Sequence, residues 1–202
     1  MRLLALEKVR LTYFFVPVSD VNLNTLISER GGLLVDQKTT YSKKTEKLEL
    51  AHPCISEFQD TEINDRLIDL GLQAGLFSRF RVDDNFANNE YERLYIEWLT
   101  KSINKSIALK TFIAKQDSEI VGITTLGGRS EFAEIGLVAV DENYRGRGIA
   151  SNLVHFAERT AFDLGYPELK VVTQLQNKGA CRLYEKCNFN IESITNVYHY
   201  WQ

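Results

Sequence analysis

One stretch of the chain, residues 133–164, constrains the fold more than any other. It begins with Ala133-Glu-Ile-Gly-Leu-Val-Ala-Val140, a run too continuously apolar for a strand with one face in water. A polar turn at residues 141–143 ends that run abruptly. Residues 149–164 then carry apolar side chains at helical spacing. The sequence therefore predicts a strand covered on both faces, a short turn, a glycine-rich elbow and an amphipathic helix.

The elbow reads Arg145-Gly-Arg-Gly148. Its two glycines carry no Cβ atom, so the N–H groups of the first helical turn stay unobstructed. Those donors and the positive end of the helix dipole form an anion site, and the two arginines add charge at its rim. A diphosphate held mainly by main-chain amides would fit. An arginine-flanked glycine helix start is equally ordinary turn chemistry, so this fragment alone leaves both interpretations open.

The elbow and the segments after it resemble the GCN5-related N-acetyltransferase (GNAT) family. The family's diphosphate loop has the form Gln/Arg-x-x-Gly-x-Gly/Ala, which residues 145–150 match as Arg-Gly-Arg-Gly-Ile-Ala. A strand at residues 168–174 follows the helix, and Asn177 to Phe189 is similar to the family's Asn-x-x-Ala-x-x-x-Tyr-x-x-x-Gly-Phe. Asn188 stands where glycine is usual, and asparagine tolerates left-handed backbone angles. The resemblance covers roughly residues 108–202 and implies an α/β fold in which flanking helices cover a mixed central sheet with an antiparallel meander.

The resemblance implies acetyl-CoA as co-substrate, with its thioester and pantetheine arm along the central strand and no metal. A strand that lends its amides to a ligand must part from its neighbour, so we expect a bulge or splay near residues 137–139. Asn177 would contact the pantetheine arm, although it could equally be a helix cap. The residues assigned to the co-substrate are Val138, Val140, Arg145, Gly146, Arg147, Gly148, Ile149, Ala150, Ser151 and Asn177.

Two side chains are candidates for proton transfer. Tyr184 is the predicted general acid, because a phenol with a pKa of about 10 stays protonated at neutral pH and suits a leaving thiolate whose conjugate acid lies around 8.5. The alternative is that Tyr184 only packs its helix on the sheet. Glu134 could act as a base through water or be a solvated strand end. The histidines at positions 52, 155 and 199 are expected to be structural.

The segments before the central strand predict two regions. Residues 1–60 read as a small α/β lobe, with strands at 9–16 and 33–41 around a helix, and residues 61–202 as the acetyltransferase domain. In that domain, two helices bracket a loop of alternating aromatic and charged residues, a two-strand meander leads to the central strand, and two final strands end the chain. Those elements are expected at 62–75, 91–103, 111–115, 119–126, 189–194 and 197–201.

The bracketed loop is the predicted acceptor site. Two arginines among aromatic rings suit a phosphorylated ligand that contains a base, although the rings could be core anchors and the arginines could pair with Asp83 and Asp84. This loop and the helix after it are similar to bacterial dTDP-4-amino-sugar N-acetyltransferases of the dTDP-fucosamine type, which implies a dTDP-linked amino sugar as the acceptor. The predicted substrate-binding residues are Phe77, Arg79, Phe80, Arg81, Asp83 and Tyr200.

Two other functions stay open from the sequence. The same chemistry could act on a protein N-terminus, a polyamine or another small amine, and a cationic rather than an acidic acceptor groove would favour the sugar nucleotide. The chain could instead be a non-catalytic module that binds acyl-CoA. Because the terminal residues 198–201 could exchange between subunits or close the sheet, a homodimer is a further possibility.

Bulk properties limit the partners and the compartment. Of the 202 residues 44% are hydrophobic, enough for a core, and the formal net charge of −3 argues against nucleic acid or an anionic membrane as main partner. The first eight residues do not resemble a signal peptide, and no apolar run reaches about 18 residues, so we expect a cytoplasmic protein. The three cysteines follow no metal-ligand spacing and are expected to be free thiols.

Overall fold

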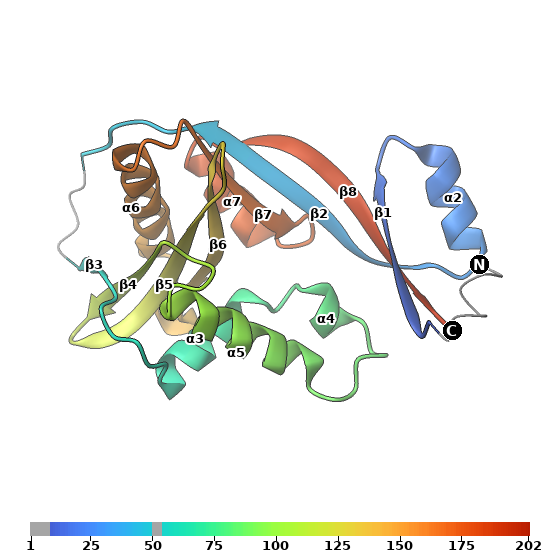
Figure 1. The fold of residues 1–202 in the computed structure, drawn as a ribbon, viewed down its shortest axis with the longest axis horizontal. Coiled ribbons are helices and arrows are strands. Elements are labelled where there is room, and N and C mark those ends of the chain that lie inside the picture. The colour runs from blue at the N-terminus through green and yellow to red at the C-terminus, as the bar shows by residue number, and fades with distance from the viewer. Residues whose placement is uncertain (1–8, 50–53) are drawn as a thin grey trace.

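A computed structural model of the protein describes residues 9–49 and 54–202. The N-terminal segment and His52, discussed above, lie outside these residues. The described strands form one eight-stranded sheet in the order β1-β8-β2-β7-β6-β5-β4-β3 (Figure 1). Its strands are β1 Leu11–Pro17, β2 Leu33–Lys44, β3 Ile55–Glu57, β4 Lys110–Gln116, β5 Glu119–Gly128, β6 Ala133–Val140, β7 Glu168–Gln174 and β8 Asn190–Trp201.

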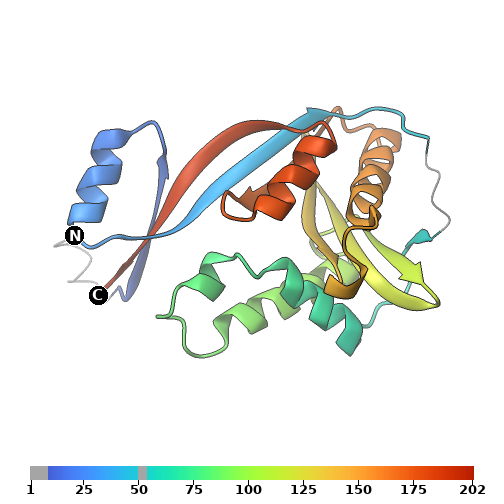
Figure 2. The ribbon, with the colours of Figure 1, turned by 180° about the vertical axis from the view of Figure 1, so that it is seen from behind.

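Helices cover both faces of the central strands. On one face, α3 and α5 pack a core that includes Leu67, Leu99 and Leu137. On the other face, α6 and α7 pack a second core around Leu153 and Ile135 (Figures 1 and 2). Side chains of β6 thus enter both cores, which confirms the doubly covered strand. The helices are α2 Val21–Glu29, α3 Asp65–Ala74, α4 Arg79–Val82, α5 Glu90–Ile103, α6 Ile149–Asp163 and α7 Lys178–Lys186.

The sheet is mixed, as expected. Strands β3 to β6 form an antiparallel meander, and β6 pairs with β7 in parallel after the crossover through α6. The predicted bounds of β6 and β7 agree with the structure to the residue. Asn188, which follows α7, has φ 63°, so asparagine does occupy a left-handed position there. The α/β fold implied by the resemblance is confirmed.

The described residues before position 50 do not form a sheet of their own. Strand β2 lies between β7 and β8 and is antiparallel to both, and β1 pairs with β8. At the far end of this ribbon, α2 buries Ile27 against Val16 and Tyr198 (Figure 2). A boundary at residue 60 therefore stays a prediction about domains, and it does not separate two sheets.

The prediction of two terminal strands at 189–194 and 197–201 was wrong. Residues 190–201 form the single strand β8. Its middle is paired on both sides, since Asn196 lies opposite Val16 in β1 and Gln37 in β2. The Gln37 amide also donates a hydrogen bond of 3.1 Å to the Asn196 side chain. Because both edges of the segment are hydrogen-bonded, the chain continues straight where the sequence suggested a turn.

Candidate active site

Strands β6 and β7 are paired over only part of their length, and beyond it they separate. Their pairing is confined to residues 133–135 of β6 and 169–171 of β7. Just beyond, Gly136 and Leu137 together oppose the single residue Thr125 of β5, which is a β-bulge. The Leu137 N–H donates to the Thr125 hydroxyl at 2.9 Å, and a Cβ at Gly136 would lie only 2.8 Å from that oxygen. The predicted splay is confirmed, one residue earlier than expected.

A cavity of about 510 Å³ opens where the two strands separate. Its walls come from residues 134–138 of β6, residues 172–174 of β7, α7 with its cap, the α4–α5 region and the first half of β2. Phe15 of β1 and Ala74 of α3 complete the lining. It therefore brings together segments from both ends of the chain. Of the predicted site residues, the cavity gathers Glu134, Val138, Asn177, Tyr184, Arg79 and Phe80.

The glycine elbow forms a second, smaller cavity of about 240 Å³ farther along β6. Gly146 and Gly148 both have left-handed φ angles, 77° and 78°, and a Cβ at either position would meet nothing within 4 Å. Helix α6 begins directly after Gly148 without a side-chain cap, so its first N–H groups face this space. The cavity is lined by Val140, Tyr144, Arg145, Gly146, Gly148, Ile149, Ala150, Ser151 and Lys186.

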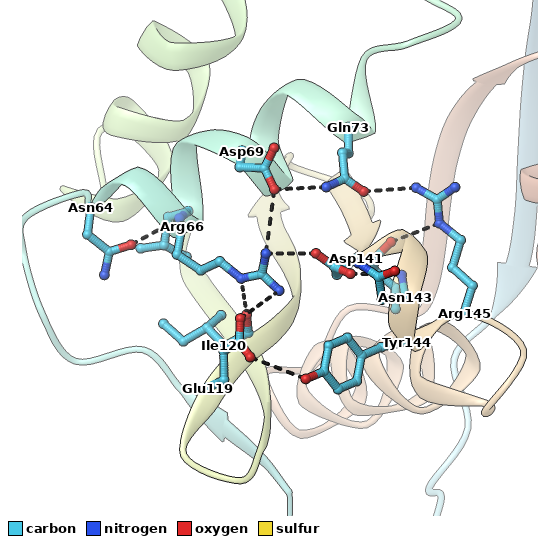
Figure 3. A network of polar contacts seen from close by, with 12 residues as sticks. Asn64, Arg66, Asp69, Gln73, Glu119, Ile120, Asp141, Asn143, Tyr144 and Arg145 are labelled. Carbon is cyan, nitrogen blue, oxygen red and sulfur yellow. Dashed lines mark hydrogen bonds and ion pairs between the residues drawn. The ribbon is translucent and has the colours of Figure 1, made fainter.

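The two elbow arginines have different surroundings. The Arg145 guanidinium donates to the Val140 carbonyl at 3.0 Å and to Gln73 of α3 at 2.9 Å, so it braces the elbow against a helix (Figure 3). The Arg147 guanidinium lies over the Tyr144 ring at 5.0 Å and donates to the Asn143 carbonyl. Both remain near the elbow, but Arg145 is partly committed to protein contacts.

A polar network on α3 holds the turn before the elbow. Arg66 of α3 contacts Asp141 at 2.7 Å and Glu119 at 3.2 Å, and the Tyr144 hydroxyl donates to Glu119 (Figure 3). The Asn143 N–H also donates to Asp141. The hydrogen bond from the Asn143 N–H is the larger cause, and the contact with Arg66 the smaller one, that holds the pKa of Asp141 below its ordinary value. The network thus ties the end of β6 and the elbow to one helix.

Tyr184 is buried in the wall of the large cavity. Its ring lies 5.7 Å from that of Tyr41 and 5.9 Å from that of Phe189. Burial raises the pKa of Tyr184 well above its usual value, so its hydroxyl keeps its proton at neutral pH. Asn177 caps α7 by accepting a 3.1 Å hydrogen bond from the Ala180 N–H, and its side chain lines the same cavity. The cap is confirmed, and contact with the co-substrate stays a prediction.

Glu134 has a partner already. Its carboxylate accepts two hydrogen bonds from the Arg129 guanidinium, at 3.0 and 3.1 Å, and its side chain is 30% exposed at the cavity rim. Its role as a base stays a prediction.

The predicted acceptor residues divide among several places. Arg79 lines the large cavity, where its guanidinium lies over Tyr13 and Phe80 at 5.2 and 4.7 Å. Arg81 stacks on Tyr91 and lines a neighbouring pocket of about 200 Å³. Neither Phe77 nor Tyr200 lines the large cavity.

Asp83 serves the protein interior. Its fully buried carboxylate lies 2.5 Å from Nδ1 of His199. It also accepts hydrogen bonds from the Trp201 indole N–H at 2.9 Å and from the Asn85 side chain. Burial opposes its ionisation, but these hydrogen bonds outweigh it and lower the pKa of Asp83. Burial lowers the pKa of His199, so its ring is neutral. The expected structural role of His199 is confirmed, and Asp83 joins the α4–α5 loop to β8.

We expect Asp83→Ala to destabilise the protein by about 2–4 kcal/mol, because it leaves buried donors of His199 and Trp201 without an acceptor. Urea denaturation followed by circular dichroism measures this. The exposed neighbour supplies the control, since Asp84→Ala should change the free energy of unfolding by less than about 0.5 kcal/mol. Equal stability of the two variants would contradict the bridging role.

Sequence reasoning missed several residues at the two cavities, charged and aromatic ones among them. Asp36 and Lys38 of β2 and Trp98 of α5 line the large cavity, and Lys186 at the end of α7 lines the elbow cavity. Asp36 could have been noticed in the sequence, because a charged residue directly follows Leu33-Leu-Val35 within a predicted strand. Trp98 sat in the apolar stripe of its helix and gave no distinct signal.

Residues 74–189 match the acetyltransferase (GNAT) family. The spore coat polysaccharide biosynthesis protein SpsD of Bacillus subtilis is 26% identical over 92% of this chain and 65% of its own length. The dTDP-fucosamine acetyltransferase of Escherichia coli is 28% identical over 92% of this chain and 81% of its own. A solved GCN5-related N-acetyltransferase from Sphaerobacter thermophilus superposes with a TM-score of 0.62 at 16% identity, over 95% of this chain and 59% of that one.

The chain belongs to the acetyltransferase (GNAT) family. It spans 65% of the length of the spore coat relative and 59% of the Sphaerobacter structure, less than two thirds of each. In the part of the chain that the structure describes, no helix has the length and apolarity to cross a membrane. Over residues 9–49 and 54–202, no three His, Cys, Asp or Glu side chains are grouped to hold a metal ion. The cysteines at 54, 181 and 187 are free thiols, as expected.

Proposed function

We propose that this protein transfers the acetyl group of acetyl-CoA to a primary amine carried by a dTDP-linked deoxyamino sugar. The observation that carries the proposal is the arrangement along β6. Its end leads into an amide-lined elbow, and its bulged middle opens onto a cavity that contains a protonated tyrosine. Members of this family use acetyl-CoA, whose thioester supplies an acetyl group activated for attack by an amine.

The elbow residues fit a diphosphate. The space beside Gly146 and Gly148 is open, the first N–H groups of α6 face it, and Arg145 and Lys186 line it with positive charge. From there an extended pantetheine arm can follow β6, whose pairing with β7 has ended. Unpaired β6 amides near Val138 would stabilise the oxyanion that develops on the thioester carbonyl. Tyr184 would give its proton to the departing sulfur.

The acceptor wall favours a sugar nucleotide. Arg79 is stacked among rings from β1 and α4 at the large cavity, and Lys38 adds a second cation. Forked donors suit a diphosphate and aromatic rings suit a base. The two relatives point the same way, since one is named for dTDP-fucosamine and the other for polysaccharide biosynthesis.

A comparison of acceptors tests the proposal. Thiol release from acetyl-CoA should be fastest with a dTDP-linked 4-amino-4,6-dideoxyhexose and at least about tenfold slower in kcat/KM with the same sugar lacking the nucleotide, because each lost diphosphate contact removes on the order of 1.4 kcal/mol or more. Polyamines and peptides with free N-termini complete the panel. Faster release with one of these would overturn the acceptor. Calorimetric binding of acetyl-CoA with no thiol release from any amine would instead indicate a non-catalytic module.

A further inference from the structure

Asp36 lines the large cavity, although it comes from a segment that the sequence placed outside the acetyltransferase domain. It belongs to β2, the strand from the beginning of the chain that lies between β7 and β8. Lys38, two residues along the same strand, pairs with Gln174, the last residue of β7. A register shift against β8 falls between Leu34 and Asp36, and bulges of this kind re-aim a side chain. Asp36 therefore lies just beyond the end of β7, in the same cavity as Tyr184.

The Asp36 carboxylate is buried without full compensation. The residue is only 5% exposed, and its Oδ1 atom has no hydrogen-bond partner within the described residues. An unsatisfied buried carboxylate costs folding free energy, so its presence in a cavity wall calls for a ligand that completes it. A primary ammonium group, with positive charge and several N–H donors, is the chemical complement of such a carboxylate.

The charged and titratable groups around Asp36 come from five elements. Burial raises the pKa of Asp36 to about 6, and the positive charges of Arg79 on α4 and Lys38 on β2 oppose that rise. Tyr95 of α5 also feels its charge. Tyr184 of α7 and Glu134 of β6 line the same cavity. At neutral pH the group is therefore an ionised carboxylate that is more basic than an ordinary aspartate, and a base whose pKa lies near the working pH is the most effective.

We propose that Asp36 binds the ammonium group of the acceptor and removes its proton, an inference that rests on the proposed acetyl transfer. One N–H bond of the ammonium breaks as an O–H bond forms on Asp36. The freed lone pair forms a bond to the thioester carbon, whose π electrons move to oxygen. The C–S bond then breaks, and the sulfur takes the Tyr184 proton. The resulting tyrosinate takes the proton that the acylated nitrogen loses, and Asp36 releases its own to water.

The pH dependence of turnover tests this role. We expect Asp36→Asn to lower kcat/KM for the acceptor by about 100-fold or more and to remove the acidic limb of the pH profile, because general-base catalysis contributes about 10² to 10⁴. Glu134→Gln is the competing variant, and it should keep that limb. Asp117→Asn, in the exposed β4–β5 turn, is the matched control and should behave as wild type. The calorimetric Kd for acetyl-CoA should be the same in wild type and Asp36→Asn.

A stability measurement separates lost chemistry from lost folding. The folded-state pKa of about 6 lies above the ordinary 3.8, so ionised Asp36 destabilises the fold increasingly as pH rises between these values. Asp36→Asn should therefore melt at a higher temperature than wild type at pH 8, and at the same temperature below about pH 4.

Each outcome assigns the failure to one claim. Wild-type turnover of an amine, together with an Asp36→Asn variant within about threefold of it, would overturn the inference and leave the acetyl transfer standing. The same holds if Glu134→Gln, and not Asp36→Asn, loses the acidic limb. If the wild type releases no thiol with any amine, the proposed function fails first and the inference falls with it.

Discussion

Replacing Gly148 with aspartate should weaken acetyl-CoA binding about 100-fold. The new carboxylate would stand in the open space beside the first amides of α6, where the proposed diphosphate lies. Two unit charges about 5 Å apart at an effective dielectric constant of about 20 repel by about 3 kcal/mol, which is about two powers of ten in affinity. Isothermal titration calorimetry of wild type and variant with acetyl-CoA measures the effect.

Gly148→Asn is the matched control. Asparagine has the same shape as aspartate, and both tolerate the left-handed backbone that φ 78° requires. The asparagine variant should therefore bind acetyl-CoA within about tenfold of wild type, and any difference between the two variants measures charge alone. Raising the salt concentration should narrow that difference, because the site is open to solvent. Equal affinities for the two variants would place the diphosphate elsewhere.

The elements best predicted from the sequence are those whose evidence is local. The run from Ala133 to Val140 needs no distant partner to show that both its faces are covered, and the stripe on α6 follows from its spacing. The splay beside Leu137 was also predictable, since a strand that serves a ligand must leave its neighbour. The strand and the helix are each evident from a few consecutive residues, whereas the splay followed from what the family resemblance implied about the central strand.

The strand order had no such local evidence. Nothing in residues 33–44 indicates that they pair between β7 and β8, about 130 to 160 residues later in the chain. For the same reason β8 was divided into two strands, because the pairing partners that keep Asn196 extended come from β1 and β2. The N-terminal segment consequently looked like a separate lobe, although it supplies part of the cavity wall through Asp36.

The site shows the same division. The elbow motif locates one cavity, but it cannot say that Gln73 of α3 binds Arg145 or that Lys186 closes the other side. The alternation of arginine and phenylalanine in residues 77–83 suggested one binding surface, yet Arg79 and Arg81 lie at different pockets. Alternate positions around a single turn of α4 point to different sides, and only the packing of the turn decides which side faces the ligand.

Removing the Tyr184 hydroxyl should lower kcat by about 100-fold to 10,000-fold, the range that a general acid contributes. Tyr184→Phe keeps the ring that packs between Tyr41 and Phe189, so stability and the Kd for acetyl-CoA should stay close to wild type. Tyr41→Phe is the matched control, because it removes a neighbouring buried hydroxyl, one that donates to Glu185 at 3.2 Å. Equal turnover by both variants would leave Tyr184 with a packing role only.

The leaving group offers an independent check on Tyr184. A CoA thiolate with a conjugate acid near a pKa of about 8.5 benefits from a proton as the C–S bond breaks, whereas an aromatic thiolate of much lower pKa leaves without one. The acetyl ester of such a thiol should therefore react at similar rates with wild type and Tyr184→Phe, while acetyl-CoA separates them by the full factor. A variant equally slow with both thioesters would show that Tyr184 positions the acetyl group and does not protonate the sulfur.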